Sequence, residues 1–589
     1  MKGHHGNGGV LSLAVPASHV SSFLKAVLLR LMGRASPTSE RRVRRRLLET
    51  VHAFAHLARN ATFDLADYAK RIGIGLNHLD WIFTRLIVPL TKVCFYCTEG
   101  TGTGSSVWYF RKPMWESVCQ QELESMQKSG ILEPESSAPS IARSEAGVSR
   151  LRFVPKANGG LRPIMNCKGI NYRLAFVSHA LKAAFRNPHR TTHASRPQMM
   201  GLSEFYAVYR DFVLKVASTQ DGCGTMHMLT MDIEKCFDNL DQEMVCRAVR
   251  ELLEQETFVI SGYNQVFLTN KVVKRVRMIA HRTIELYAKG IDAGDTEPAF
   301  EDIFERARAS SSTSILIDRA EAWPVDRQEI IRKVAQHIKT NKTRFGSTVF
   351  CQRRGIPQGS ILSSLLCSIC IDFFEAKHME ALLFDEPSLA RPKLPADAHT
   401  APSAVAPTLC VRMLDDFLVI SPDRNRILAF KREMERGFPE FGIRVKAEKT
   451  LLSTDERPSL PWCGLLLNSR DLSVGLDESR LDLRRASACP QLRRLSIREQ
   501  LRQAAEVILL RADPVLFDRH INPAVVAERN LLIVLRLAKP KLDQAARKAC
   551  QARLITFIYR LLLSRTKSNS ALTRPHVRRI VMAELQQTK

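Results

Sequence analysis

Between residues 40 and 130, apolar residues recur every three or four positions, as they do on the buried face of a helix. The members of this pattern are Leu47, Leu48, Val51, Phe54 and Leu57, then Leu76, Leu79, Ile82 and Leu86. Residues 150–470 alternate short apolar runs with helical patterns, which indicates an α/β or α+β body. From about residue 480 glycine disappears and Leu, Ala and Arg dominate, so we expect a helical domain there.

Three stretches interrupt this organisation. Residues 1–39 begin rich in Gly and His and contain no acidic residue, and we expect them to be mobile. Residues 255–345 are amphipathic and should be helical, as at 272–286 and 327–338. Residues 385–408 hold five prolines and few large apolar residues, which is typical of a loop.

Two separate apolar segments carry acidic residues, one at its end and the other in its middle. Residues 228–233 predict a buried strand that presents Asp232, and residues 410–420 predict a hairpin with Asp415 and Asp416 at its turn. Adjacent like charges are costly unless a cation neutralises them, and carboxylate oxygens suit magnesium. Two such strands could hold a pair of ions for phosphoryl transfer. An exposed Asp-Asp turn without a function is the alternative.

Further residues fit the same chemistry. Gln358 and Gly359 lie in Gly-Ile-Pro-Gln-Gly-Ser, where glycine lets the backbone approach a flat ligand. Lys156 and Arg162 flank a Gly-Gly turn and could clamp a triphosphate. Lys449 could protonate a leaving pyrophosphate. For each of these residues alone, an ordinary turn or surface charge is the alternative.

The overall charge favours a polyanionic partner. The chain has 87 Lys and Arg against 60 Asp and Glu and a pI near 9.8. From Arg480 to the end there are 23 basic and 8 acidic residues, which predicts phosphate contacts. An organism with generally basic proteins is the other explanation. The pairs Cys94/Cys97 and Cys367/Cys370 lack further ligands nearby, so we interpret them as core thiols rather than zinc ligands.

In this order the motifs resemble a reverse transcriptase, and three further features resemble telomerase reverse transcriptase. The first is Phe95-Tyr96-Cys97-Thr98-Glu99 followed by Trp108 to Trp115, which looks like that family's T motif. The second is the insertion at 255–345, which looks like the family's insertion in the fingers. The third is Trp462-Cys463-Gly464, which looks like its primer grip.

The resemblance implies an α+β right-hand polymerase preceded by a mainly helical RNA-binding domain. The expected parts follow the mobile segment 1–39 in chain order. They are the RNA-binding domain with its T motif at 40–149, fingers at 150–225, the first part of the palm at 226–254, the helical insertion at 255–345, the second part of the palm at 346–475 with its Pro-rich loop at 385–408, and a helical thumb at 476–589. The palm should contain an antiparallel sheet.

The resemblance also assigns roles to individual residues. Asp232, Asp415 and Asp416 match the catalytic triad, Ile233 would ligate metal through its carbonyl, and Lys449 matches a catalytic lysine. Two Mg²⁺ ions are the implied cofactor. The nucleotide-binding residues would be Lys156, Arg162, Phe237 as a gate against the ribose 2′-hydroxyl, Gln358 and Gly359. The RNA-binding residues would be Phe95, Tyr96, Thr98, Glu99, Trp108, Arg111, Lys112 and Trp115, with core packing as the alternative for each aromatic ring.

The implied activity is RNA-templated DNA synthesis at chromosome 3′ ends. Its partners would be a telomerase RNA, telomeric single-stranded DNA, an RNA–DNA hybrid, deoxynucleoside triphosphates and a separate anchoring or telomere protein, in the nucleus at telomeres and without a membrane. Only 94 residues precede the T motif, so we expect a short form that lacks the family's usual N-terminal domain. The alternatives are a mobile-element reverse transcriptase and an inactive RNA-binding scaffold.

Overall fold

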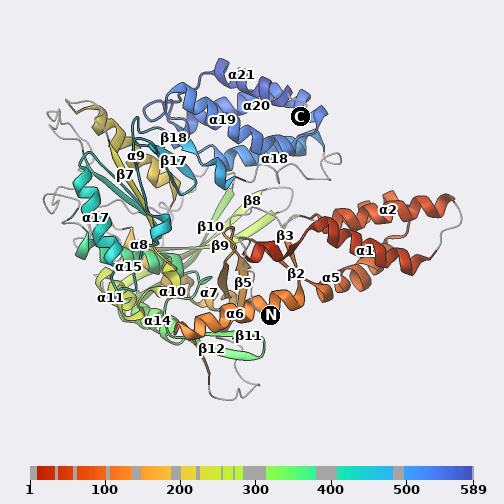
Figure 1. Ribbon diagram of the computed structural model, residues 1–589, viewed down its shortest axis with the longest axis horizontal. Helices are drawn as coiled ribbons and strands as arrows, with labels where there is room; N and C mark the ends of the chain where they lie inside the picture. The colour runs from red at the N-terminus through yellow and green to blue at the C-terminus, as the bar shows by residue number, and fades with distance from the viewer. Residues whose placement is uncertain are drawn as a thin grey trace.

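In the computed structural model, the described residues form five sheets and the helices that pack with them (Figure 1). The structure describes residues 9–33, 38–57, 63–100, 107–135, 147–186, 201–219, 226–253, 257–268, 272–282, 314–379, 382, 407–481 and 496–586. In Figure 1 a helical arm extends to the right, the palm lies at the left and the C-terminal helices lie above. This arrangement agrees with the expected α+β fold of a right-hand polymerase.

The palm sheet has four antiparallel strands in the order β13-β14-β7-β15. These strands are β7 (His227–Asp232), β13 (Leu409–Met413), β14 (Asp416–Ser421) and β15 (Leu451–Leu452). Leu229 and Met231 face one hydrophobic cluster, whereas Met228, Leu418 and Ile420 face another. Because both faces are covered, the strands are continuously apolar rather than alternating.

Helices α8 (Ala175–Phe185), α11 (Gln242–Leu252), α15 (Ser363–His378) and α17 (Arg424–Arg436) contribute to the cluster on the first face. On the other face, α9 (Leu202–Ala217) packs with the thumb and with β16 (Ser459–Trp462) and β17 (Leu465–Asn468). The buried carboxylate of Asp518 in the thumb accepts bonds from Tyr206 Oη at 2.6 Å and Arg210 Nε at 3.0 Å. Helix α9 was expected in the fingers; these contacts place it between palm and thumb.

The fingers contain a five-stranded sheet in the order β4-β12-β11-β5-β6. Its members are β4 (Leu132–Pro134), β5 (Val148–Pro155), β6 (Leu161–Asn166), β11 (Lys342–Phe345) and β12 (Thr348–Gln352). Strand β5 pairs with β6 antiparallel and with β11 parallel. The sheet therefore draws strands from both sides of the palm sequence, which the expected boundaries at 150–225 and 346–475 did not capture.

The N-terminal domain combines helices with a small sheet. Its helices are α1 (Ala17–Met32), α2 (Thr38–Ala55), α3 (Leu65–Ile72), α4 (Leu76–Trp81), α5 (Val88–Cys94) and α6 (Lys112–Lys128), and its strands are β1 (Ala14–Val15), β2 (Phe95–Glu99) and β3 (Val107–Arg111). The expectation of a mobile 1–39 segment is wrong for residues 9–33. Val20, Leu24 and Leu28 of α1 are buried in one cluster with Leu47 and Val51 of α2, and this burial holds α1 in place.

The insertion is only partly helical. Strands β8 (Thr257–Leu268), β9 (Val272–Arg282) and β10 (Ser314–Asp326) form a sheet in the order β10-β8-β9, so the predicted helix over 272–286 is wrong wherever the structure describes it. Valines at 272, 273 and 276 fit both helical and strand spacing, and pairing with β8 decides between them. Helix α14 (Arg327–Lys339) confirms the second prediction. Residues 385–406 of the Pro-rich loop lie outside the described residues.

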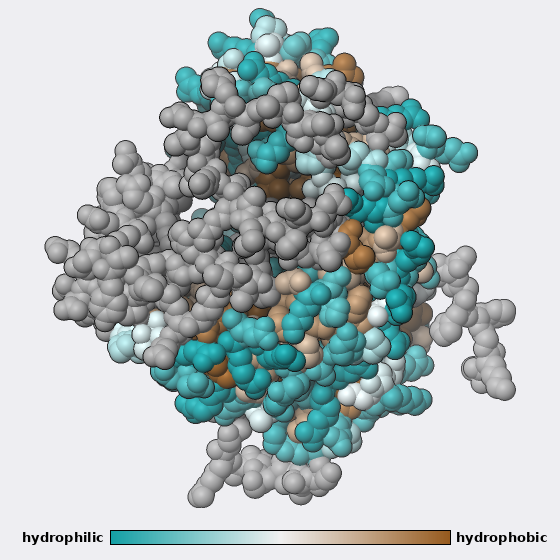
Figure 2. Space-filling model, turned by 90° about the vertical axis from the view of Figure 1, so that its left-hand side faces the viewer, coloured by the Kyte–Doolittle hydropathy of each residue, from teal (hydrophilic) through white to brown (hydrophobic). Residues whose placement is uncertain are grey.

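The C-terminal part is helical, as predicted. It consists of α18 (Ile497–Arg511), α19 (Ala524–Ala538), α20 (Gln544–Arg565) and α21 (Arg574–Gln586), which pack beside β18 (Val474–Leu476). Figure 2 turns the palm side of the molecule toward the viewer; among the coloured residues of that face, hydrophilic ones predominate and apolar patches lie between them. Within the described ranges, no helix has the length and apolar character that a membrane span requires.

The two cysteine pairs differ from each other. Cys367 and Cys370 are buried core thiols on α15, as expected, whereas Cys94 is half-buried and Cys97 is exposed on β2. The expectation of a core thiol is therefore wrong for Cys97.

Truncation of Leu24 tests whether α1 is part of the folded domain. Leu24 is fully buried, so Leu24→Ala should cost about 2–5 kcal/mol of unfolding free energy. Leu31 on the same helix is 65% exposed, and Leu31→Ala should stay within about 0.5 kcal/mol of the wild type. Chemical denaturation followed by tryptophan fluorescence measures both variants. Equal effects of the two substitutions would contradict the packing of α1.

Candidate active site

Strand register brings the three predicted carboxylates to one edge of the palm sheet. Asp232 is the last residue of β7, Asp416 is the first residue of β14, and the two are direct partners in the antiparallel pairing. Asp415 occupies the turn just before β14, and its carbonyl accepts a hydrogen bond from Ile233 N at 3.2 Å. Asp232 and Asp416, which are 184 positions apart in the sequence, therefore meet, as predicted.

The turn that carries Asp415 is strained and buttressed. Leu414 has a φ of 57°, a left-handed conformation that leucine rarely adopts. Its carbonyl accepts a hydrogen bond from Arg412 at 2.7 Å, and the same guanidinium pairs with Glu375 of α15 at 2.7 Å. Both side chains of this ion pair are at least nine-tenths buried. The buried ion pair thus stabilises the strained turn from the interior of the protein.

Charges of both signs surround the carboxylates. Burial, and then the neighbouring Asp232, raise the pKa of Asp415, while Lys449 and Arg162 act in the opposite direction. Lys449 Nζ lies 2.7 Å from Asp232 Oδ2, so the predicted catalytic lysine is held at the site by a predicted catalytic carboxylate. The arrangement concentrates negative charge and offsets it with the positive charges of Lys449 and Arg162.

The donor set fits a divalent cation. Carboxylates are hard oxygen ligands, and the proximity of Asp232 already disfavours ionisation of Asp415, which a cation would reverse. Among the described residues, no group of three His, Cys, Asp or Glu side chains converges into a ready-made ion site. Asp232 instead holds the Lys449 ammonium. A cation at this site would compete with the Lys449 ammonium for Asp232 Oδ2. The role predicted for the Ile233 carbonyl stays a prediction.

The predicted nucleotide pocket is assembled by backbone contacts. Phe237 is half-buried on the short helix α10 (Cys236–Asn239), and its carbonyl accepts a hydrogen bond from Ile356 N at 2.7 Å. A Cβ added to Gly355 would lie 2.3 Å from the same carbonyl, so only glycine fits there. The Gln358 carbonyl accepts a bond from Met165 N at 2.7 Å, and a Cβ on Gly359 would lie 2.3 Å from Met165 O. The loop around Gln358 is thus held between α10 and the fingers sheet.

Asp238 is a site residue that sequence reasoning missed. It is 8% exposed, and its Oδ1 accepts a hydrogen bond from Gln358 Nε2 at 3.0 Å. Burial raises the pKa of Asp238, whereas Gln358 and Lys156 act in the opposite direction. The side chain therefore orients the amide of Gln358. The only signal in the sequence was its place next to Phe237.

Lys156 and Arg162, the residues predicted to clamp a triphosphate, lie on one hairpin of the fingers sheet. Lys156 follows β5, and Arg162 is the second residue of β6. Burial, and then the charge of Arg162, lower the pKa of Lys156. The charge of Arg162 also lowers the pKa of Asp415, so the hairpin lies near the predicted catalytic carboxylates.

The predicted primer grip contacts Asp416 directly. Cys463 and Gly464 have φ values of 49° and 84° and close the two-residue turn between β16 and β17. The buried Trp462 donates from Nε1 to Asp416 O at 3.2 Å, and Cys463 Sγ lies 3.7 Å from Asp416 Oδ2. The ring of Trp462 packs on Phe205, with ring centroids 4.8 Å apart.

The predicted RNA-binding residues divide into two groups. Trp115 is 4% exposed and stacks on Tyr96 with ring centroids 4.8 Å apart, so it is a core residue and its prediction as an RNA contact is wrong. Thr98 is buried as well, and Glu99 pairs with Arg152 of the fingers. The Thr98 hydroxyl donates to the carbonyl of Glu99, and the Glu99 carboxylate joins the N-terminal domain to the fingers. The remaining residues keep at least partial exposure; they are Phe95, Tyr96, Trp108, Arg111 and Lys112.

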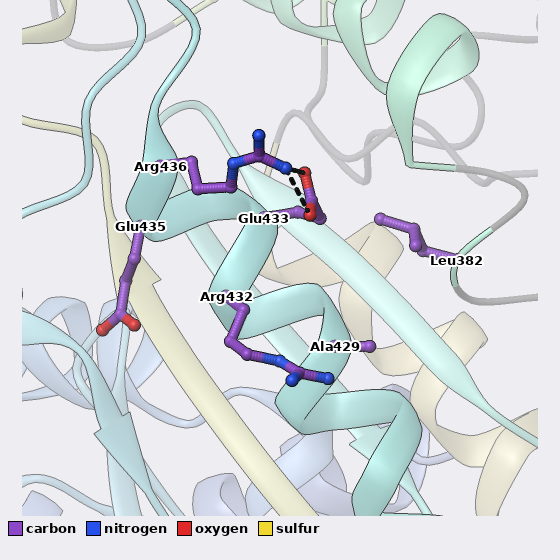
Figure 3. A pocket seen from close by; sticks show the side chains of 6 residues that line it. All are labelled: Leu382, Ala429, Arg432, Glu433, Glu435 and Arg436. Carbon is purple, nitrogen blue, oxygen red and sulfur yellow. Dashed lines mark hydrogen bonds and ion pairs between the residues drawn. The ribbon is translucent and has the colours of Figure 1, made fainter.

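A pocket of about 540 Å³ lies elsewhere, on α17 (Figure 3). Leu382, Ala429, Arg432, Glu433, Glu435 and Arg436 line it. Arg436 pairs with Glu433 at 3.1 Å, and the helix buries its opposite face, with Ile427, Phe430 and Met434, toward the palm. None of the catalytic carboxylates contributes to this pocket.

Comparisons with known proteins point in one direction. Residues 51–126 match the telomerase ribonucleoprotein complex RNA-binding domain, and residues 302–470 match the reverse transcriptase (RNA-dependent DNA polymerase) family. The chain is related to the telomerase reverse transcriptases. The telomerase reverse transcriptase of Bos taurus is 26% identical over 452 residues, 70% of this chain, and that of Arabidopsis thaliana is 22% identical over 493 residues, 79% of this chain.

Telomerase structures share the fold. The telomerase of Candida albicans in complex with a TWJ fragment of telomeric RNA matches with a TM-score of 0.68 at 15% identity, over 99% of this chain and 88% of that one. The complex from Candida tropicalis matches with a TM-score of 0.60 at 15% identity, over 100% and 86%. The chain spans 37% and 41% of the length of the Bos taurus and Arabidopsis thaliana telomerase reverse transcriptases. The match to the reverse transcriptase family includes Asp415 and Asp416 but not Asp232.

The buried carboxyl of Asp238 makes stability depend on pH. Asp238→Asn should raise the thermal unfolding midpoint at neutral pH, because the amide oxygen can still accept from Gln358 while the buried charge is removed. Since the folded-state pKa of Asp238 lies above the unfolded one, its ionisation disfavours folding at high pH. The gain should fade as the pH falls toward the ordinary carboxyl pKa.

Calorimetry from acidic to neutral pH measures the unfolding midpoints of the wild type and of Asp238→Asn, and the substitution of an exposed carboxylate, Asp455→Asn, is the control. A gain that grows on acidification would contradict the assignment.

Proposed function

We propose that the protein is the catalytic subunit of a telomerase, which extends DNA 3′ ends by copying an RNA template. The observation that carries the proposal is the pairing of Asp232 with Asp416 beside Asp415. Trp462 of the predicted primer grip bonds to Asp416, and α10, which follows β7, bonds to the predicted nucleotide loop. A telomerase RNA, a single-stranded telomeric DNA end and deoxynucleoside triphosphates are the proposed ligands. The proposed location is the nucleus, at telomeres, with a separate protein as the anchor for DNA.

In the proposed reaction the primer 3′-oxygen bonds to the α-phosphorus as the bond to pyrophosphate breaks. Asp232, Asp415 and Asp416 would hold two Mg²⁺ ions, with the carbonyl of Ile233 as a further oxygen ligand. When bound, such ions stabilise charge on the attacking and leaving oxygens. The protein contributes position and charge, which is the main source of catalysis in phosphoryl transfer.

Residues of the chain itself supply the remaining steps. Lys156 and Arg162 would hold the triphosphate, and Gln358, fixed by Asp238, would contact the base or sugar. Phe237 would exclude a ribose 2′-hydroxyl. Lys449 lies within reach of Asp232 and would move to the leaving pyrophosphate and protonate it.

Nucleic-acid binding is proposed for two surfaces. The basic excess from Arg480 onward would contact the phosphates of the RNA–DNA hybrid. Arg111, exposed at the end of β3, and Lys112, which begins α6, could bind the phosphates of single-stranded RNA, and the half-buried Trp108 of β3 could stack on a base. The match to the telomerase RNA-binding family over 51–126 supports this second surface.

The alternatives find less support. An inactive scaffold would not need to keep three carboxylates together with a strained, buttressed turn beside them. A mobile-element enzyme does not explain the match to a telomerase RNA-binding domain.

Loss of a catalytic carboxylate should abolish synthesis. Purified protein should extend a DNA primer on a short RNA template, and Asp232→Ala or Asp415→Ala should lower the rate by at least about 10³-fold without weakening hybrid binding. Glu456→Gln removes an exposed carboxylate and serves as the control. Extension by either variant at the control rate would contradict the proposal.

Sugar selectivity tests the gate. Phe237→Ala should admit ribonucleotides, because it removes the ring that would meet the 2′-hydroxyl. The ratio of kcat/KM for dGTP and GTP, measured on one template, should fall by about 10-fold or more. Incorporation of dGTP at a similar rate shows that the variant is folded. An unchanged ratio would remove Phe237 from this role.

A further inference from the structure

Residues 9–15 connect two parts of the protein that lie far apart in sequence. We call these residues the strap. At one end, Val10 N donates a hydrogen bond to Gly159 O at 2.8 Å. At the other end, β1 pairs with β3, with Ala14 opposite Phe110 and Val15 opposite Tyr109. The strap therefore joins the nucleotide-binding hairpin of the fingers to the sheet of the N-terminal domain.

The contact between strap and hairpin is backbone against backbone. Gly9 and Gly159 both have positive φ values, 49° and 82°. A Cβ on Gly9 would lie 2.5 Å from Gly159 Cα, and a Cβ on Gly159 would lie 2.8 Å from Gly9 Cα. Real Cβ atoms do not come this close to backbone, so the approach requires glycine on both sides.

Gly159 belongs to the turn that carries Lys156. Gly159 N donates to Lys156 O at 3.0 Å, and Lys156 N donates to Gly160 O at 2.7 Å. Arg162 follows this turn as the second residue of β6. The strap, which contacts Gly159, therefore restricts the conformation of the turn between Lys156 and Arg162, the two proposed triphosphate ligands.

Apolar packing holds the strap in place along its length. Val10, Leu11 and Ala14 are partly buried against a cluster that contains Leu151 and Leu161 of the hairpin. The same cluster contains Phe110 and Trp115 of the N-terminal domain. The strap thus shares one small core with both elements that it joins.

We propose that the strap positions the hairpin of Lys156 and Arg162 for the triphosphate and links its geometry to the N-terminal domain. This inference rests on the proposed function, because it concerns the nucleotide of that reaction. The strap precedes residues 51–126, which match the RNA-binding family, so that match does not account for it. Strap residues act through the hairpin and are positioning residues, without contact to the reacting atoms.

Two substitutions separate the strap from the hairpin. Gly159→Ala introduces the Cβ clash, and Val10→Pro removes the N–H donor at the start of a 3₁₀ turn, where proline is tolerated. Gly130→Ala is the control for the first variant, because Gly130 has a φ of 71° and no atom within 4 Å of its added Cβ. Val10→Ala is the control for the second, because it keeps the N–H.

Nucleotide binding should weaken while turnover is preserved. Both test variants should raise KM for the nucleotide about 10-fold with kcat within about 2-fold, since they remove positioning of ground-state and transition-state contacts alike. The dissociation constant of dGTP from a complex with a dideoxy-terminated primer should rise by the same factor. Hybrid affinity should not change. Amide exchange at residues 156–160 should accelerate in Val10→Pro and not in Val10→Ala.

The outcomes distinguish this inference from the proposed function. If the test variants match their controls in dGTP affinity and in amide exchange, the positioning role is overturned. If the wild type binds dGTP in the terminated complex with the expected variant effects but extends no unterminated primer, the proposed function fails and the strap stands. If the wild type binds no nucleotide, both are overturned.

Discussion

The antiparallel register of β7 and β14 is the constraint on which the site depends. It sets Asp232 directly against Asp416, an arrangement of like charges that disfavours the sheet by itself. A slip by one residue would turn Asp232 to the opposite face. Apolar packing on both faces of the strands prevents this slip, with Met231 and Phe417 in one cluster and Leu418 in the other. Hydrophobic burial therefore holds together carboxylates that repel each other, and the charges of Lys449 and Arg162 offset that repulsion.

Close backbone contacts fix the position of the predicted nucleotide pocket relative to the palm sheet. A Cβ on Gly355 would lie 2.3 Å from Phe237 O, and one on Gly442 would lie 1.8 Å from Asn239 O. The short helix that bears Phe237 is thus enclosed by two glycine-containing segments, one of which leads to Gln358. Arg412 and Glu375 act in the same way on the Asp415 turn, through a buried ion pair. Residues that take no part in the chemistry determine where the reacting groups lie.

Sequence patterns predicted the elements whose signal is local. The apolar runs ending at Asp232 and around Asp415 predicted their strands because both faces of the palm sheet are buried. The same reasoning misassigned 272–282, since its valines fit either period and the partner strand β8 lies outside the local window. Asp238 escaped notice because its partner, Gln358, is 120 positions away. Trp115 was predicted to bind RNA, because its burial against Tyr96 depends on tertiary packing that the local sequence does not show.

Iron-directed cleavage of the backbone tests the central claim most directly. Fe²⁺ substituted for Mg²⁺, with ascorbate and peroxide, generates hydroxyl radicals that cut the chain beside the bound ion. If one ion site is built from both segments, cleavage should occur near residue 232 and near residues 415–416 in the same sample, and excess Mg²⁺ should suppress both cuts together. Asp232→Asn should then remove both cuts as well. Cleavage at one segment alone, or persistence of the 415–416 cut in that variant, would contradict the shared site.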